Sequence, residues 1–418
     1  MQVSRMAGSL IGSEIIKIGN EVNDMIRKGE QICNLTIGDF DPSIFPIPEE
    51  LQQEITLAYQ AGHTNYPPAN GMAGLREAAA TFTRTRLGLE YSPNDFLVAG
   101  GSRPLIYATY LALVDPGDKV VFPVPSWNNN HYCHLSSAQG VMVETRAENN
   151  FMPTAEELAP HLEGATLLAL CSPLNPTGTV FTREGLEAIC DLVLAENKRR
   201  QPGEKPLYLL YDQIYWLLTF GTTEHYDPVN LRPELRDYTI YIDGISKCLA
   251  ATGVRVGYAF GPAVVIDKMK AILGHVGAWA PKAEQVATAK YLPQSEKVDG
   301  FLGQFKEKVQ RSLDTLHQGL QDLKTAGYPV DSMVPMGAIY LTAKLDVLGK
   351  KTPAGQVLTT TKELTSYLIS EARLALVPFS AFGNDHTAPW FRMSVGGASL
   401  DSIEAALPRL RAALDSLV

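Results

Sequence analysis

The chain has 418 residues, of which 45% are hydrophobic and 19% charged, so it can bury a sizeable core and is not a disordered chain. Its net charge of −9 argues against nucleic acid or an anionic membrane as the main partner. The five cysteines are scattered without zinc-type spacing, so we expect neither a metal site nor a disulfide framework. We therefore expect the protein to lie in a reducing compartment, the cytoplasm.

The first hundred residues read as helices joined by short extended segments. Apolar residues at helical spacing predict an amphipathic helix over 10–28, and residues 32–37 are typical of a short strand. Further helices are predicted over 49–61 and 72–87. No apolar run is long enough to cross a membrane, and the first residues lack the pattern of a secretory signal.

From residue 96 onward, strands and helices alternate. The expected strands cover 96–99, 119–122, 141–145, 166–171, 207–211, 239–242 and 256–260. This alternation predicts an α/β fold with a mainly parallel sheet flanked by helices. Such sheets bind ligands beyond the carboxyl ends of their strands.

After about residue 260 the pattern changes to that of a smaller α+β unit. The expected elements are helices over 285–292, 298–326 and 400–417, and strands over 335–341, 374–378 and 391–395. The short N-terminal strand needs a partner, and we expect it in this unit. The predicted division is therefore an arm over 1–45 that joins the small domain, a large domain over 46–295 and the small domain over 296–418.

Polar and aromatic side chains follow most strands of the expected parallel sheet. They are Ser102, Arg103, Trp127, Asn175, Asp212, Tyr215 and Lys247. A lysine amine can form a Schiff base with a carbonyl cofactor. Ser246 and Arg255 beside it, with the helix start after Gly101, can hold a phosphate on the same molecule. Pyridoxal phosphate carries both groups, so the sequence favours this cofactor.

Each of these residues also has an ordinary structural explanation. Lys247 could be one surface lysine among many, Asp212 a helix N-cap, and Tyr215 a core tyrosine. Trp127 could be exposed or lie in an interface, and Arg392 could form a surface ion pair. The placement of several such residues at one end of the same sheet is what favours a binding site.

Four motifs carry a resemblance to a known family. They are Asn175-Pro-Thr-Gly178, Asp212-x-x-Tyr215, Ser246-Lys247 followed by Arg255, and Phe391-Arg392. In this order they resemble the class I and II aminotransferases of fold type I, over nearly the whole chain. The resemblance implies a pyridoxal-phosphate enzyme that moves an amino group between an amino acid and a 2-oxo acid.

The resemblance also implies residue roles. Lys247 would be the Schiff-base lysine and proton carrier, and Asp212 would keep the pyridine nitrogen protonated. Tyr215 and Asn175 would contact the phenolic oxygen, and Trp127 would stack on the ring. The phosphate would be bound by Ser102, the amide of Arg103, Ser246 and Arg255, and by Tyr66 from the second subunit of a homodimer. The substrate would meet Arg392 at its α-carboxylate, together with the Gly38 backbone, Trp127 and Asn175.

Two departures from the family pattern affect these roles. Gly244 stands where the family often has a phosphate-binding serine, and Arg103 stands where many relatives carry a neutral residue. Arg103 could compensate at the phosphate or could meet a distal acid group of the substrate. The loop Trp127–His131 resembles the version found in aspartate and aromatic aminotransferases, which implies a dicarboxylic or aromatic amino acid as the substrate. The Asn175–Pro176 bond is a candidate for a cis peptide.

Two alternatives stay open at the level of sequence. Another enzyme on the same scaffold, such as a β-lyase, a decarboxylase or a cyclising synthase, would share the cofactor and Lys247. A pyridoxal-phosphate-binding regulatory module is less favoured, because such a regulator would need a basic DNA-binding segment and the 37 residues before Gly38 are not notably basic.

Overall fold

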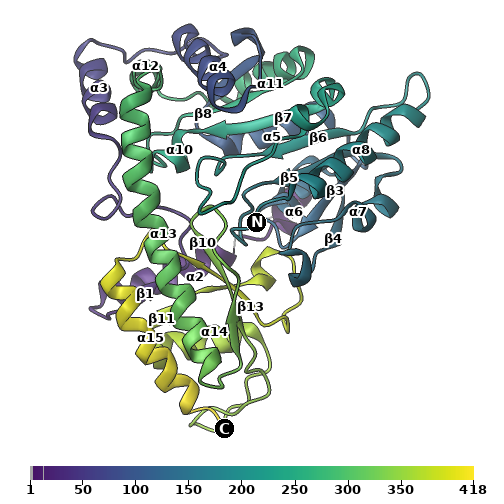
Figure 1. The fold of residues 1–418 in the computed structure, drawn as a ribbon. Helices are drawn as coiled ribbons and strands as arrows, with labels where there is room; N and C mark the ends of the chain where they lie inside the picture. The colour runs from purple at the N-terminus through teal and green to yellow at the C-terminus, as the bar shows by residue number, and fades with distance from the viewer. Residues whose placement is uncertain (1–2, 13) are drawn as a thin grey trace.

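A seven-stranded sheet forms the centre of the larger body in the computed structural model, which describes residues 3–12 and 14–418 (Figure 1). The strands in spatial order are β2 (Phe96–Ala99), β8 (Gly257–Phe260), β7 (Thr239–Gly244), β6 (Tyr208–Asp212), β5 (Ala165–Cys171), β3 (Lys119–Val124) and β4 (Gln139–Glu144). Only β8 runs antiparallel to its neighbours, β7 and β2. The predicted mainly parallel sheet is confirmed.

Helices cover both faces of this sheet because its strands are apolar on both sides. Along β5, Leu167 and Ala169 pack in one core cluster with α5 (Ser102–Leu113) and α11 (Ala263–Val276). Leu168 and Leu170 pack in the other cluster. That second cluster includes α4 (Ala73–Leu87), α7 (Ala155–Leu162) and α8 (Arg183–Arg199). The period of two along the strand thus builds two cores.

The smaller body is built on a four-stranded sheet. Its order is β12 (Val377–Pro378), β13 (Trp390–Ser394), β10 (Tyr340–Leu345) and β9 (Val330–Ser332). It packs with α13 (Ser295–Thr325), α14 (Thr361–Ala372) and α15 (Leu400–Asp415). The N-terminal strand β1 (Cys33–Asn34) pairs in parallel with β11 (Leu374–Ala375), so its expected partner lies in this body.

The long helix α13 connects the two bodies, as Figure 1 shows. Val298 and Leu302 in its first turns belong to the core of the larger body, whereas the positions from Phe305 onward belong to the smaller one. The helix α3 (Glu49–Gln60) lies beside α12 (Lys282–Tyr291).

The exact domain boundaries after residues 45 and 295 stay a prediction, because α13 is shared between the two cores.

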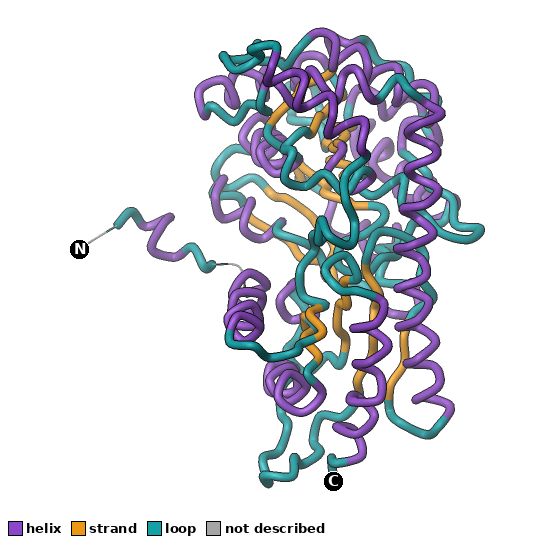
Figure 2. The backbone as a smooth tube through the Cα atoms, turned by 90° about the vertical axis from the view of Figure 1, so that its left-hand side faces the viewer, coloured by secondary structure: helices purple, strands orange, loops and turns teal. Residues whose placement is uncertain are grey.

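The N-terminal helices lie at the edge of the molecule. The helix expected over 10–28 is observed as α2 (Glu14–Arg27), and residue 13 of that range lies outside the described residues. The short helix α1 (Arg5–Ser9) stands away from the main body in Figure 2. It contacts α6 (Asn129–Ser136) through the Met6 carbonyl, 2.8 Å from the His134 ring. Within residues 3–12 and 14–418, no helix is long and apolar enough to span a membrane.

Some local predictions were wrong. The strand expected over 335–341 begins only at Tyr340, because Gly337 packs tightly against the Leu218 carbonyl and Ala338 adopts a positive φ of 57°. Helices α11 and α14 were not predicted. Their β-branched residues weaken the helical pattern, and α14 depends on a capping box in which Thr360 and Glu363 bond each other's backbone.

Candidate functional site

A cavity lies between the carboxyl ends of the parallel strands and the small sheet. Its volume is about 670 Å³. The predicted site residues that line it are Gly38, Ser102, Arg103, Trp127, Asn175, Asp212, Tyr215, Ser246, Lys247, Arg255 and Arg392. Of the predicted site residues, Tyr66 alone does not line it. The residues predicted from strand ends and those implied by the resemblance, Gly38 and Arg392 among them, therefore share one cavity.

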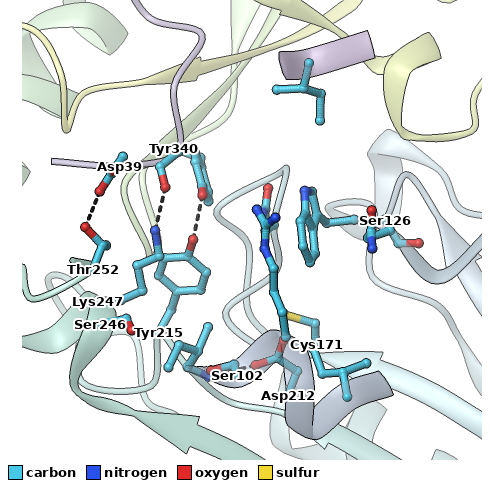
Figure 3. Close-up of a pocket in the computed structure, with 18 of the residues that line it drawn as sticks. Asp39, Ser102, Ser126, Cys171, Asp212, Tyr215, Ser246, Lys247, Thr252 and Tyr340 are labelled. Atoms are coloured by element: carbon cyan, nitrogen blue, oxygen red, sulfur yellow. Dashed lines mark hydrogen bonds between the residues drawn. The ribbon is translucent and has the colours of Figure 1, made fainter. Parts of the chain in front are cut away.

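Lys247 lies on α10 (Ile245–Cys248), the short helix that follows β7. Its Nζ donates a hydrogen bond to the Gly38 carbonyl, which the close-up in Figure 3 marks. Burial lowers the pKa of Lys247 to about 8, although Asp39 acts in the opposite direction. A lysine with a pKa near neutral pH supplies the uncharged amine needed for attack on a carbonyl group.

Asp212 ends strand β6, opposite Cys171 on β5. Burial raises its pKa to about 6, while the hydrogen bond from the Ile214 amide, 3.1 Å from Oδ1, lowers it. That short-range bond is one an N-cap aspartate also makes, but it uses one carboxylate oxygen only. None of the ion pairs among the described residues includes Asp212. The carboxylate can therefore accept from a cationic N–H in the cavity.

The start of α5 forms one corner of the cavity. Ser102 is its first residue, and the Ser102 hydroxyl is buried without a hydrogen-bond partner. Arg255 faces this corner, with its Nη2 2.7 Å from the Gly100 carbonyl and its Nη1 2.7 Å from the Thr252 carbonyl. A helix N-terminus, an unpartnered hydroxyl and a guanidinium together form a site suited to phosphate.

The glycine at position 244 is required by the sheet. Its φ is 155°, and a Cβ there would lie 2.8 Å from both the Gly257 Cα and the Val256 oxygen on the neighbouring chain segment. A serine side chain has no room between these backbones. The hydroxyl that the family often has here is thus excluded by the close approach of Gly244, at the end of β7, to Val256 and Gly257 at the start of β8.

We expect Gly244→Ser to destabilise the protein by about 1–3 kcal/mol, the usual cost of overpacking. Urea unfolding measures this change. Gly253→Ser is the matched control, because nothing lies within 4 Å of a Cβ at that position. Equal unfolding free energies for the two variants would contradict the steric explanation.

Arg392 is nearly inaccessible, with 2% of its surface exposed. Its Nη1 donates to Asn175 Oδ1 at 3.1 Å, its Nη2 donates to the Thr36 carbonyl, and its Nε is buried with no partner. No carboxylate of the described residues pairs with it. Burial argues against a surface ion pair, and a guanidinium with a spare donor is suited to an entering carboxylate.

Tyr215 follows β6 and is buried beside a residue that the sequence analysis missed. Its hydroxyl lies 2.5 Å from the hydroxyl of Tyr340, the first residue of β10 (Figure 3). Tyr340 also lines the cavity. The only hint in the sequence would have been its place in a strand that pairs with the strand of Arg392, and that pairing was not predicted.

Trp127 and Arg103 line the cavity in contact with each other. The Arg103 guanidinium lies 4.6 Å from the centre of the Trp127 ring, a cation–π contact. Tyr66, in contrast, is 80% exposed, and its ring packs at 5.2 Å against Trp279 on the outside of the cavity. Among the described residues, no group of His, Cys, Asp and Glu side chains could hold a metal ion.

Comparisons with known proteins place the chain in a family. The family model described as aminotransferase class I and II matches residues 30–410. The chain belongs to this family. It is an aminotransferase of a family that uses pyridoxal phosphate. The aspartate aminotransferase of Rhizobium meliloti (strain 1021) is 31% identical over 410 residues, which cover 97% of this chain and 94% of that protein.

Other relatives of this aminotransferase agree. A probable aspartate/prephenate aminotransferase of Rhizobium leguminosarum bv. phaseoli is 30% identical over 402 residues, covering 96% of this chain and 95% of that protein. The crystal structure of the aspartate aminotransferase from Rhizobium meliloti matches with a TM-score of 0.90, 30% identity and full coverage of both chains. The Thermus thermophilus aspartate aminotransferase with maleate matches with a TM-score of 0.87 at 28% identity, covering 99% of this chain and 100% of that one.

Proposed function

We propose that this aminotransferase binds pyridoxal phosphate at Lys247 and moves an amino group between a dicarboxylic amino acid and a 2-oxo acid. The observation that carries the proposal is the shared cavity. It contains an amine with a lowered pKa at Lys247, a carboxylate without a cation partner at Asp212, and buried donors without partners on Ser102 and Arg392. Lys247 would react with the aldehyde of the cofactor, and Asp212 would pair with its pyridine nitrogen. Ser102 would bind the cofactor phosphate, and Arg392 would bind the substrate carboxylate.

The cavity residues would hold the two ends of the cofactor separately. At the phosphate end, Ser102, Ser246, Arg255 and the amide of Arg103 supply donors near the start of α5. At the ring, Trp127 offers a face, and Asp212 accepts from the ring nitrogen. Tyr215 and Asn175 are the donors for the phenolic oxygen, on the side of the cavity where Arg392 also lies.

The residues of this chain then carry out proton chemistry. Pyridoxal phosphate, when bound, supplies a ring that withdraws electrons from the substrate α-carbon. Lys247 Nζ is the base that takes the proton from that carbon. Asp212, whose pKa is about 6, is mostly ionised at pH 7 and so holds a proton on the ring nitrogen. The small sheet forms the side of the cavity that carries Arg392 and Tyr340.

The substrate would be oriented by two cations. Arg392 takes the α-carboxylate, next to the Gly38 backbone and Asn175. Arg103 is the remaining cation of the cavity without an assigned partner, and none of the ion pairs among the described residues includes it. Together with the relatives described as aspartate aminotransferases, it favours a second carboxylate on the substrate.

The active form would be a homodimer. Tyr66 is exposed and does not line the cavity of its own chain, which suits a residue that reaches the phosphate of the second subunit. The N-terminal segment exposes apolar side chains, with Val3 70% and Ile11 77% exposed. A second copy of the chain would bury such a surface.

The test is a screen of amino donors with the wild-type protein and Arg103→Met. We expect amino transfer from aspartate or glutamate, and a loss in kcat/KM of roughly 10- to 100-fold for these donors in Arg103→Met, because a charge-assisted hydrogen bond is lost. Donors with an aromatic side chain should be affected little. An equal loss for every donor, with weaker cofactor retention, would instead assign Arg103 to the phosphate.

The screen also separates the alternatives that the sequence left open. Products of elimination or decarboxylation, with no amino group transferred to any 2-oxo acid, would contradict the proposal and favour a β-lyase, a decarboxylase or a synthase.

A further inference from the structure

Tyr340 connects the two halves of the cavity. It belongs to β10 in the small sheet, and 1% of its surface is exposed. Its hydroxyl oxygen is 2.5 Å from that of Tyr215, which follows β6 in the large sheet. The guanidinium of Arg392 lies over its ring, 4.8 Å from the ring centre. One tyrosine therefore contacts both the proposed substrate clamp and a proposed cofactor contact.

The packing around the Tyr340 hydroxyl fixes its position. A Cβ at residue 38 would lie 2.7 Å from this oxygen, so the space that glycine leaves is filled by Tyr340. The Gly38 carbonyl in turn accepts from Lys247. The titratable and charged groups that face Tyr340 are Tyr215, Arg392, Cys171 and Asp39.

The direction of the hydrogen bond between the two hydroxyls follows from their surroundings. Burial raises the pKa of both tyrosines, but for Tyr340 the nearby Arg392 charge is the next largest influence and lowers the pKa. Either hydroxyl can donate in this pair, and the Arg392 guanidinium, 4.8 Å from the centre of the Tyr340 ring, favours Tyr340 as the donor to the Tyr215 oxygen. The proton of Tyr215 is then free for an acceptor in the cavity, and a donor that itself accepts a hydrogen bond is strengthened.

We propose that Tyr340 is a positioning residue that transmits the occupancy of Arg392 to the cofactor through the hydroxyl of Tyr215. This inference rests on the proposed function. A carboxylate bound at Arg392 compensates the guanidinium charge, which makes Tyr340 a weaker donor and Tyr215 a weaker donor in turn. The nitrogen that joins Lys247 to the cofactor then gains proton affinity when substrate binds.

The test is a pH titration of the visible absorbance of the cofactor-loaded protein, with and without succinate, a dicarboxylate that has no amino group. We expect Tyr340→Phe to raise the titration midpoint by about half a unit to one unit, because one hydrogen bond to Tyr215 is lost. The rise that succinate causes in the wild-type protein should shrink by at least about half.

Tyr367→Phe is the matched control. Tyr367 is also buried, and its hydroxyl bonds the Ala413 carbonyl at 2.7 Å and the Ser416 hydroxyl at 2.6 Å, within the smaller body and outside the cavity. Its midpoint should equal that of the wild-type protein. A second comparison uses Tyr215→Phe, in which adding Tyr340→Phe should cause no further shift because the connection runs through Tyr215.

The outcomes are distinct. A midpoint and a succinate response of Tyr340→Phe equal to those of the wild-type protein would overturn the inference. A full shift that persists in the Tyr215→Phe background would overturn it as well. If the wild-type protein gains no visible absorbance on incubation with pyridoxal phosphate, the proposed function itself is wrong, and the inference about Tyr340 falls with it.

Discussion

Lys247→Ala should abolish amino transfer, with kcat lower by at least about 10⁴-fold. The proposed lysine performs two tasks, since it attaches the cofactor and moves the proton at the substrate α-carbon, and proton transfer alone contributes up to about 10⁴-fold. The burial that lowers its pKa to about 8 supports this assignment, because a surface lysine would stay charged and inert at neutral pH. Steady-state kinetics with the preferred donor measure the loss.

The control for this variant is a lysine that lies outside the cavity. Lys324 on α13 forms an ion pair with Asp331 at 2.7 Å, and half of its side chain is exposed. Surface pairs of this kind contribute little to stability. Lys324→Ala should therefore retain the activity of the wild-type protein. Activity of Lys247→Ala at the same level would show that the lysine is misassigned.

Asp212→Ala should lower kcat by at least about 10²-fold while the protein keeps its cofactor. The carboxylate is proposed to hold a proton on the pyridine nitrogen, and removing one preorganised electrostatic contact in an enclosed site has an effect of this size. We propose that cofactor retention depends chiefly on the phosphate donors around Ser102 and Arg255, and the substitution leaves these residues in place. The measurements are kcat and the cofactor content after gel filtration.

Asp227 provides the comparison for the N-cap interpretation of Asp212. It caps α9 (Pro228–Leu231), accepting from the amides of Val229 and Asn230, and lies outside the cavity. Asp227→Ala should cost roughly 2–4 kcal/mol of stability, because it removes both the cap and the acceptor of the buried Tyr241 hydroxyl, and should leave kcat unchanged. If Asp212→Ala behaves in the same way, with near-normal turnover, Asp212 is a structural cap.

The sequence predicts those parts of the site that depend on the order of strands and turns. Lys247, Asp212 and Asn175 each lie at the carboxyl end of a strand of the parallel sheet or within a few residues of it, and the carboxyl ends of such strands share one edge. The Asn175–Pro176 bond is cis in the structure, as the sequence suggested. Local motifs and the expected sheet were enough for these residues.

Other parts depend on packing that a motif does not record. Tyr340 enters the cavity because β10 pairs with β13 and the small sheet lies against the large one. Gly244 was interpreted as a missing phosphate ligand, whereas its neighbours Val256 and Gly257 leave no space for any side chain. Both features arise from contacts between segments that are distant in the sequence, or from the spacing of two backbones.

Covalent trapping tests the central proposal most directly. The protein is loaded with pyridoxal phosphate, reduced with borohydride and digested, and the labelled peptide is identified by mass spectrometry. The structure predicts a stable label on Lys247 and on no other lysine, with the label lost in Lys247→Ala and unchanged in Lys324→Ala. A label on a different lysine, or its retention in Lys247→Ala, would contradict the proposed role of Lys247 and with it the proposed mechanism.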